Sequence, residues 1–268
     1  MPASPAAVSR VDPFDAFGFD QRYYDRWIRL ARVYFRWLRV SVDGLQNLPD
    51  AGGGILVGNH AGHRWHDTTS LQFAARRLHG GKRVVRPLIF NGLGKFPVAG
   101  HVITQYAGGV VAHPRNVEYL LDRDELVLVY PEGVNSTLKR FGERNRPCPV
   151  EQWGSGFVRA AIRSGKPIVP VVGYGFESTV PTIALSRRLG RFWGMPKGLY
   201  PVSPQALLLG TVPMNSGAIP FPVKCHLSIL PPIHVDGRFD RDAQIRELVG
   251  AVWEVIADRL SCLRAGRR

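Results

Sequence analysis

Short apolar runs recur along the chain, and segments with helical periodicity separate them. The apolar runs cover residues 54–57, 84–90, 109–112, 126–130 and 168–173, and the helical segments cover 68–79, 116–123 and 154–164. Because parallel strands need a crossover connection, this alternation favours an α/β fold with a mostly parallel sheet flanked by helices. In such a sheet, ligands bind in the loops that follow the carboxyl ends of the strands.

The segments outside this alternating region have a different character. Residues 1–41 predict an irregular leader and an amphipathic basic helix over 20–40, and residues 42–268 predict the α/β domain. A short strand and turn are expected at 40–45 and a last strand at 225–230.

Two later segments complete the predicted domain. Apolar residues at helical spacing predict an amphipathic C-terminal helix within 240–263, marked by Ile245, Leu248, Val249, Val252, Ile256 and Leu260. Residues 190–222 mix glycine, proline and large apolar side chains without a clear period. Two interpretations stay open for them, a loop-rich layer of the core or a lid that faces lipid.

The composition is strongly basic. Thirty-five Lys and Arg against 21 Asp and Glu give a formal net charge of +14, which favours an anionic partner. The aromatic residues form no recognised RNA-binding pattern, so we expect an anionic membrane surface and no nucleic acid. No run approaches the roughly 18–20 apolar residues of a spanning helix, and residues 1–15 lack the apolar core of a signal peptide. The expected location is cytoplasmic, peripheral on the inner face of the membrane.

The cysteines argue against a disulfide framework. Cys148, Cys225 and Cys262 are far apart and odd in number, so neither paired disulfides nor a cysteine metal site is expected. Their use fits a reducing compartment.

The helix over 20–40 is a candidate for membrane attachment. On a wheel of about 100° per residue, one face carries Arg22, Arg26, Arg29, Arg32, Arg36 and Arg39, and the opposite face carries Tyr23, Trp27, Leu30, Ala31, Tyr34, Phe35 and Leu38. Arginines can meet acidic headgroups while aromatic rings lie at headgroup level. We therefore assign membrane binding to Arg22, Arg26, Arg29, Arg36 and Trp27. A helix that covers the domain, with its arginines merely solvated, would show the same pattern.

One loop carries the main candidate for catalysis. The apolar run 54–57 leads into Asn59-His60, and Asp67 begins the next periodic segment. A histidine with a carboxylate a few residues away is the minimum for a general base held in one tautomer. Each residue also has a structural explanation, His60 as a hydrogen-bonded loop residue and Asp67 as the N-cap of the 68–79 helix.

Two further histidines leave a metal site open as the alternative enzyme. His60, His63, His66 and Asp67 together supply enough imidazole and carboxylate groups for a divalent-metal hydrolase. Their spacing matches none of the metal-binding motifs with a defined mechanism. We therefore expect no metal and no other cofactor.

Three short motifs follow along the chain. Gly109 to Arg115 joins a glycine, an apolar pair and an arginine, and Tyr130-Pro131-Glu132-Gly133 directly follows the apolar run 126–129. Pro170 lies inside the apolar run 168–173, where its missing N–H predicts a sheet edge or a bulge. Together with Asn59-His60 and Asp67, these motifs resemble the signature boxes of the glycerolipid (lysophospholipid) acyltransferase family over roughly residues 42–235. Six residues separate His60 from Asp67, which resembles a wide-spaced variant of the family.

The resemblance implies a reaction and a set of roles. A fatty acyl group would move from an acyl-CoA or acyl-carrier-protein thioester, a co-substrate, to a hydroxyl of a lysophospholipid or related lipid acceptor. His60 would be the general base oriented by Asp67, and Arg115, Glu132 and Gly133 would bind the acceptor.

One departure from the family and one alternative of another class remain. The family often has an arginine two positions after the glycine of its third box, where this chain has Asn135, so tight binding of a phosphate monoester is not expected. Lys139 and Arg140 are candidates to compensate. The alternative is a non-catalytic membrane-binding protein with the same fold. The joint presence of the catalytic and acceptor-binding residues favours the enzyme.

Overall fold

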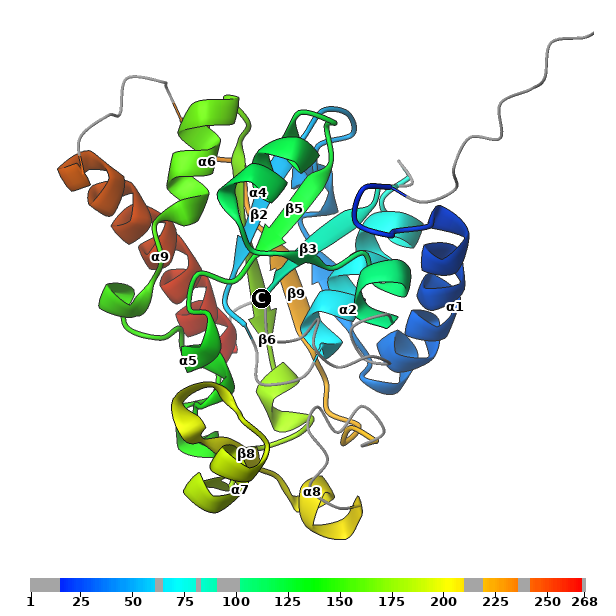
Figure 1. Ribbon diagram of the computed structural model, residues 1–268, viewed down its shortest axis with the longest axis vertical. Coiled ribbons are helices and arrows are strands. Elements are labelled where there is room, and N and C mark those ends of the chain that lie inside the picture. Colours follow the sequence, from blue (N-terminus) through cyan, green and yellow to red (C-terminus); the bar gives the residue numbers. More distant parts are fainter. Residues whose placement is uncertain are drawn as a thin grey trace, which may run out of the picture.

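The computed structural model describes residues 15–60, 65–80, 83–90, 102–209, 219–235 and 242–266. These residues form a seven-stranded sheet in the order β1-β9-β6-β2-β5-β3-β4 (Figure 1). Its strands are β1 (Ser41–Asp43), β2 (Gly54–Gly58), β3 (Val85–Ile89), β4 (Val110–Val111), β5 (Leu126–Val129), β6 (Ile168–Tyr174) and β9 (His226–Ile229). β2 to β6 run parallel, whereas β9 is antiparallel to β6 and parallel to β1. The predicted fold class, a mostly parallel sheet flanked by helices, is confirmed.

The central strands are buried on both faces. All five residues of β2 are buried, and β5 and β6 on either side of it are buried along nearly their whole length. Strands covered on both sides are continuous apolar runs rather than alternating ones. This is why the sequence predicted their positions to within one or two residues.

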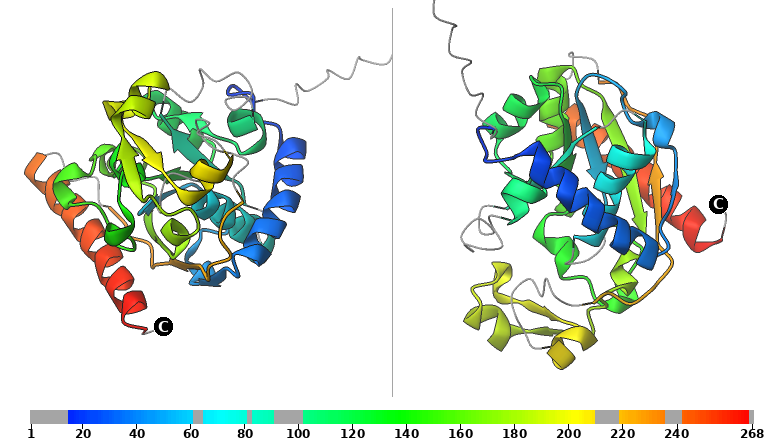
Figure 2. Two further views of the ribbon diagram at one scale, coloured as in Figure 1. Left: turned by 90° about the horizontal axis from the view of Figure 1, so that it is seen from below. Right: turned by 90° about the vertical axis from the view of Figure 1, so that its right-hand side faces the viewer.

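Helices cover the sheet in two layers. α4 (Pro114–Leu121), α6 (Gly156–Ser164) and α9 (Asp242–Arg264) pack on one face, in a core with Ile55, Val57 and Val127. α2 (His66–Phe73) packs on the other face with Leu56 and Leu128. Leu38, which directly follows α1 (Gln21–Trp37), belongs to the same core. Figure 2 shows α9 and α1 on opposite sides of the sheet. Side chains of successive strand residues therefore pack against helices on opposite faces of the sheet.

α1 packs firmly on the domain, but its buried face differs from the predicted one. Asp20 caps the helix by accepting a hydrogen bond from the backbone N–H of Arg22 (2.7 Å), and Tyr24 and Ile28 are fully buried. Leu30, which we had placed on the apolar face, is 61% exposed. Trp27, predicted to bind membrane, is half-buried and its indole N–H donates to Gln72 (3.1 Å).

Pro170 lies in an interior strand, where the sheet forms a bulge around it. Ile168 forms an isolated bridge with Ile233, whereas Val171 pairs with Ile229, so three residues after β9, 230–232, face two residues of β6. The Pro170 carbonyl accepts from the Leu230 N–H (2.9 Å), so the side of Pro170 that lacks an N–H faces the bulge. Of the two expected explanations, edge or bulge, the bulge is confirmed.

A small lobe extends beyond the carboxyl end of β6 (Figure 1). It contains the antiparallel pair β7 (Ala184–Ser186) and β8 (Tyr200–Val202) with α7 (Arg187–Phe192) and α8 (Pro204–Leu209). Tyr200 is buried, while Phe192 is 78% exposed. The described part of 190–222 therefore combines a packed side with an exposed apolar side, and residues 210–218 lie outside the described residues.

Candidate functional site

The predicted catalytic and acceptor residues lie on segments that leave the same edge of the sheet. β2, β5, β3 and β4 are parallel neighbours, so the loops that follow them start from the same edge. Asn59-His60 follow β2, Tyr130 to Gly133 follow β5, and Arg115 lies in the first turn of α4, after β4. Three strand spacings separate β2 from β4, a distance of about 14 Å. His60 and Arg115 therefore follow strands at opposite ends of this group of four.

Asn59 ties the residue before His60 to β6. Its side-chain amide donates to the Gly173 carbonyl of β6 (2.9 Å), and its side-chain oxygen accepts from the Gly173 N–H (3.0 Å). Both groups are buried, so each depends on the other for its hydrogen bond. The clamp holds the chain immediately before His60 on the neighbouring strand.

His60 is held from two directions. Its Nδ1 lies 2.8 Å from Asp67 Oδ2, and its ring stacks on Tyr130 with centroids 4.3 Å apart and an angle of 19°. An ionised carboxylate can only accept, so Nδ1 carries the proton and Nε2 of the neutral ring keeps its lone pair. Nε2 makes no hydrogen bond to any described residue, and the side chain is 17% exposed. This arrangement can take a proton from a bound hydroxyl group.

Tyr130 is a neutral support for this ring. Its hydroxyl lies 2.9 Å from Thr68 Oγ1 in the first turn of α2, which connects the segment after β5 to the helix that carries Asp67. Burial raises the pKa of Tyr130 well above its ordinary value, and the negative charge of Asp67 raises it further. The phenol therefore stays protonated, and Tyr130 acts as a stacking partner for the imidazole rather than as a base.

Asp67 does not cap α2. The helix begins at His66 rather than at 68, and its N-cap is Trp65, which makes no side-chain cap bond. Asp67 Oδ1 accepts from the adjacent Thr68 N–H (2.6 Å), and Oδ2 faces His60. The capping explanation for Asp67 is therefore wrong. The same helix ends with a π-helical turn over Ala74–Leu78 instead of running evenly to 79.

The histidines of the metal alternative have separate partners where they are described. His66 Nδ1 lies 3.1 Å from Thr179 Oγ1, and its ring stacks on Tyr34. His63 lies outside the described residues. Within the part of the chain that is described, no group of three or more His, Cys, Asp and Glu side chains is arranged to hold a metal ion.

Glu132 is buried beside the catalytic loop. Its Oε1 accepts from the Cys148 N–H (2.8 Å), and its Oε2 lies 3.8 Å from Lys139 Nζ. Burial raises the pKa of the Glu132 carboxyl above its ordinary value, and the positive charge of Lys139 opposes that rise. Gly133 follows with φ 55° and ψ −135°, a backbone conformation open mainly to glycine, which turns the chain into α5 (Val134–Thr137).

The other residues that we considered for binding the acceptor, Arg115, Asn135 and Lys139, each have different partners. Arg115 is exposed at the start of α4, where its backbone N–H donates to the His113 ring (3.3 Å). Asn135 accepts a hydrogen bond from Lys197, which belongs to the small lobe. Lys139, which we considered as a substitute for the missing arginine, is instead paired with Glu132 and Glu177.

Sequence reasoning missed three parts of this site. Asn59 and Tyr130 were noted only as members of motifs, although one clamps the loop and the other stacks on His60. Glu177 was not singled out, and its ion pair with Lys139 (2.5 Å) joins segments far apart in sequence. The position of Tyr130 directly after β5, next to the strand before His60, was a usable signal for the stack.

All three cysteines are free, and two of them are unreactive by environment. Burial raises the pKa of Cys148 and of Cys225 to about 12, so both stay protonated near neutral pH. Neither thiol is therefore a candidate nucleophile. Separately, no helix in the described ranges has the length and apolar character needed to cross a bilayer.

Comparison with known proteins agrees with this architecture. The Acyltransferase family matches residues 39–173. An uncharacterized protein of Mycobacterium leprae (strain TN) is 35% identical over 261 residues, covering 95% of this chain and 68% of the relative. An uncharacterized protein of Mycobacterium tuberculosis (strain ATCC 25618 / H37Rv) is 34% identical over 261 residues, covering 95% of this chain and 70% of the relative.

Two further similarities involve proteins with named activities. Phytyl ester synthase 2, chloroplastic, of Arabidopsis thaliana is 33% identical over 138 residues, covering 49% of this chain and 19% of that protein. The crystal structure of the 1-acyl-sn-glycerophosphate (LPA) acyltransferase PlsC from Thermotoga maritima has the same fold, with a TM-score of 0.56 and 19% identity over 90% of this chain and 80% of that chain. From its sequence and its fold, this chain belongs to the acyltransferase family.

Proposed function

We propose that this lipid acyltransferase moves a fatty acyl group from an acyl-CoA or acyl-carrier-protein thioester to a hydroxyl of a lysophospholipid or related lipid. The observation that carries the proposal is the contact between His60 Nδ1 and Asp67 Oδ2 at 2.8 Å, with Nε2 left to act as a base. The chemistry needs no cofactor beyond the thioester itself.

The proposed reaction is a direct transfer. His60 Nε2 takes the proton of the acceptor hydroxyl as its oxygen bonds to the thioester carbonyl carbon. Asp67 stabilises the imidazolium, because an opposite charge at this distance favours the protonated ring. The carbon–sulfur bond then breaks, and the imidazolium returns its proton to the leaving thiolate. The products are an ester and a free thiol, with no acyl-enzyme.

The acceptor would lie along the edge that runs from His60 to Arg115. Gly133 turns the chain beside the buried Glu132, and Arg115 offers an exposed guanidinium at the far end. With Asn135 in the position where the family often has arginine, we propose that a phosphodiester or uncharged alcohol competes well with a phosphate monoester. The similarity to a protein named phytyl ester synthase supports this. A strong, exclusive preference for lysophosphatidic acid in an acceptor panel would refute it.

Thiol release from an acyl thioester, measured with a panel of lipid acceptors, tests the reaction. His60→Ala should lower the rate by about 10²–10⁴-fold, since positioned proton transfer contributes that much. The variant should unfold at the parent's temperature and still bind the thioester. His234→Ala, an exposed histidine on the segment after β9, is the matched control and should keep the parent rate.

Asp67→Asn separates the catalytic role from a structural one. Because Oδ1 accepts from the Thr68 N–H, the asparagine oxygen stays there and its amide nitrogen faces His60. His60 Nδ1 must then accept, and the proton moves to Nε2, which can no longer act as a base. We expect a folded enzyme with a rate loss similar to that of His60→Ala. Parent-like activity would remove Asp67 from the mechanism.

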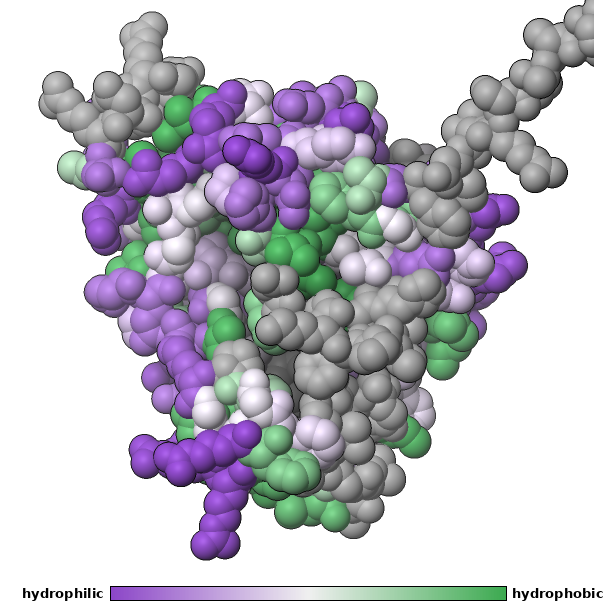
Figure 3. All heavy atoms as spheres, viewed as in Figure 1, coloured by the Kyte–Doolittle hydropathy of each residue, from purple (hydrophilic) through white to green (hydrophobic). Residues whose placement is uncertain are grey.

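We also propose that the protein attaches peripherally to an anionic membrane through the exposed side of α1. Arg22, Arg26, Arg29 and Arg36 are exposed, although Arg22 is paired with Asp20 (2.7 Å). Trp27 is turned inward and is therefore not part of the apolar surface of α1. That surface consists of Leu30, Val33 and Trp37, which are 61%, 66% and 47% exposed. Figure 3 shows hydrophobic side chains at the right-hand edge of the molecule, where α1 lies.

A second segment extends this surface. The Trp37 indole N–H donates to the Pro220 carbonyl (2.7 Å), and Arg39 donates to the Pro222 carbonyl (2.7 Å). These bonds place Ile219 and Phe221, 69% and 42% exposed, beside the end of α1. We propose that the two segments dock together, which favours the lipid-facing interpretation for this part of 190–222.

Binding to vesicles with and without anionic lipid tests the surface. Arg26→Gln, Arg29→Gln and Arg36→Gln combined should weaken binding, and salt should weaken the parent's binding in the same way. The control changes three exposed arginines of α7, Arg187, Arg188 and Arg191, to glutamine. Equal losses in both triple variants would show that net charge alone is responsible and would refute the assignment to α1.

A further inference from the structure

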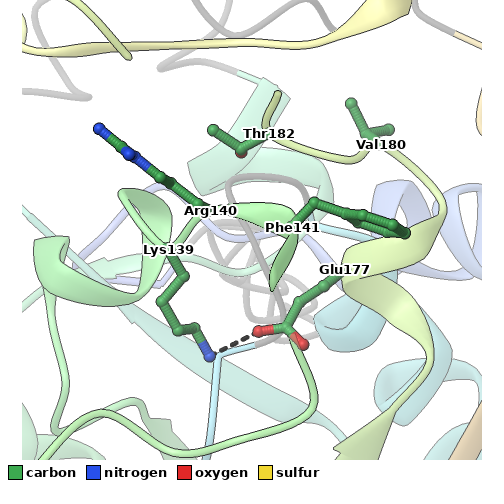
Figure 4. A pocket seen from close by; sticks show the side chains of 6 residues that line it. All are labelled: Lys139, Arg140, Phe141, Glu177, Val180 and Thr182. Carbon is green, nitrogen blue, oxygen red and sulfur yellow. Dashed lines mark ion pairs between the residues drawn. The ribbon is translucent and has the colours of Figure 1, made fainter. Parts of the chain in front are cut away.

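A buried lysine joins two buried carboxylates next to the catalytic loop. Lys139 Nζ lies 2.5 Å from Glu177 Oε1 and 3.8 Å from Glu132 Oε2. The Lys139 side chain is 9% exposed, and the side chains of Glu132 and Glu177 are 0% and 7% exposed. Figure 4 shows Lys139 and Glu177 facing each other at the base of a pocket that Phe141, Val180 and Thr182 also line.

Backbone groups hold both carboxylates in place. Glu132 accepts from the Cys148 N–H (2.8 Å), and the Cys148 carbonyl accepts from the Trp253 indole of α9 (2.8 Å). Glu177 accepts from the Asn145 N–H, and the Asn145 side chain accepts from the Gly175 N–H (2.8 Å). The carboxylates on either side of Lys139 are therefore each held by a backbone N–H group.

The cluster has one positive charge for two negative ones. Burial disfavours the charge on Lys139, but Glu132 and Glu177 more than compensate, so the pKa of Lys139 is raised and it stays charged. For Glu132, burial is the largest effect and raises the pKa; Lys139 and His60 lower it, and Glu177 raises it.

The other groups that face Glu132 do not change this balance near neutral pH. Burial raises the pKa of the Cys148 thiol to about 12 and that of the Tyr130 phenol well above its ordinary value, so both stay uncharged. The charge on Glu132 thus depends on Lys139 and Glu177 on one side and on His60 on the other.

We propose that Lys139 and Glu177 are positioning residues that act in opposite directions on the charge of Glu132 beside His60. Lys139 favours the ionised carboxylate and Glu177 opposes it, and their balance sets the lower end of the pH range of acyl transfer. This inference rests on the proposed function. An ionised Glu132 adds a second negative charge, after Asp67, that stabilises the His60 imidazolium when it takes the acceptor proton. Lys139 favours the negative charge on the buried Glu132 carboxyl. Glu177 shares the same ammonium group, so the cluster as a whole keeps a net negative charge.

Two substitutions should move the acidic limb of the pH–rate profile in opposite directions. Lys139→Met removes the cation, so Glu132 takes up its proton at higher pH and the limb moves up by about one unit or more. Glu177→Gln removes the competing anion, keeps an acceptor for the Asn145 N–H, and moves the limb down. Lys139→Arg should restore the parent limb. A merely structural role would lower the rate at every pH without these opposite shifts.

Carbon-13 NMR of the Glu132 carboxyl gives a readout that needs no activity. The resonance is assigned with Glu132→Gln and followed against pH in the parent and in both variants. Lys166→Met is the matched control, because it breaks a lysine–carboxylate pair with Asp124 (2.5 Å) just before β6, at the opposite edge of the sheet. The control should leave the Glu132 titration and the rate limb unchanged.

The outcomes separate this inference from the proposed reaction. If the Glu132 titration does not shift, or shifts the same way in Lys139→Met and Glu177→Gln, the inference is overturned. It is also overturned if the titration shifts and the rate limb does not. If the parent transfers no acyl group, the proposed function fails, while the NMR titrations still decide whether the cluster sets the charge of Glu132. Should Lys139→Met fail to fold, Glu177→Gln alone tests the direction.

Discussion

Replacing Asn59 by alanine removes the two side-chain hydrogen bonds that hold the residue before His60 on β6. The Gly173 N–H and carbonyl lose the partners they have at 3.0 and 2.9 Å. Leaving a buried donor or acceptor unpaired costs about 1–3 kcal/mol, so two such groups should lower the free energy of unfolding by about 2–6 kcal/mol. Loss of the clamp should also displace His60 relative to Asp67 and lower the rate of acyl transfer.

Urea denaturation followed by tryptophan fluorescence measures the stability, and thiol release measures the rate. Asn116→Ala is the control, since Asn116 donates one hydrogen bond, to the Val111 carbonyl (2.9 Å), in a half-buried site. It should cost about 1 kcal/mol and leave His60 in place. If Asn59→Ala were as stable as Asn116→Ala and as active as the parent, the clamp would have no role in holding the loop.

Three further predictions concern the ring under His60, the packing of α1 and the reactivity of the cysteines. Tyr130→Phe should keep most of the activity because the ring remains under His60, whereas Tyr130→Leu should lose on the order of 10–100-fold through misplacement of the imidazole; steady-state rates compare the two. Ile28→Ala, at a fully buried position of α1, should lower the free energy of unfolding by about 2–5 kcal/mol in a urea titration. Iodoacetamide at pH 8 should leave Cys148 and Cys225 unmodified in the folded protein, because their pKa of about 12 keeps them protonated, and peptide mapping should find alkylation first at the half-buried Cys262.

The strands and their parallel arrangement follow from local patterns. β2, β5 and β6 are buried on both faces, so each is an apolar run that is visible without knowledge of its neighbours. The alternation with helices then requires crossovers, and parallel strands bring their carboxyl ends to one edge. The contact between His60 and Asp67 was also predictable, because only six residues separate them in the chain.

The exposed side of α1 is a feature that local sequence patterns did not predict. Helical periodicity separates arginines from apolar residues, but it does not say which apolar residues the rest of the domain will cover. The neighbouring helix and strand cover Tyr24 and Ile28 and leave Leu30 and Val33 exposed. The set of residues available to a membrane was therefore decided by tertiary packing.

The sequence by itself determined the fold class, the positions of the strands of the seven-stranded sheet and the His60–Asp67 pair, because those depend on residues close together in the chain. Only the tertiary structure decided that β9 enters the sheet between β1 and β6 and that Lys139 forms ion pairs with Glu132 and Glu177. Contacts between distant segments leave no periodic signal in a single sequence. They exist because burial forces each charged or polar group to find a partner among whichever segments the fold places beside it.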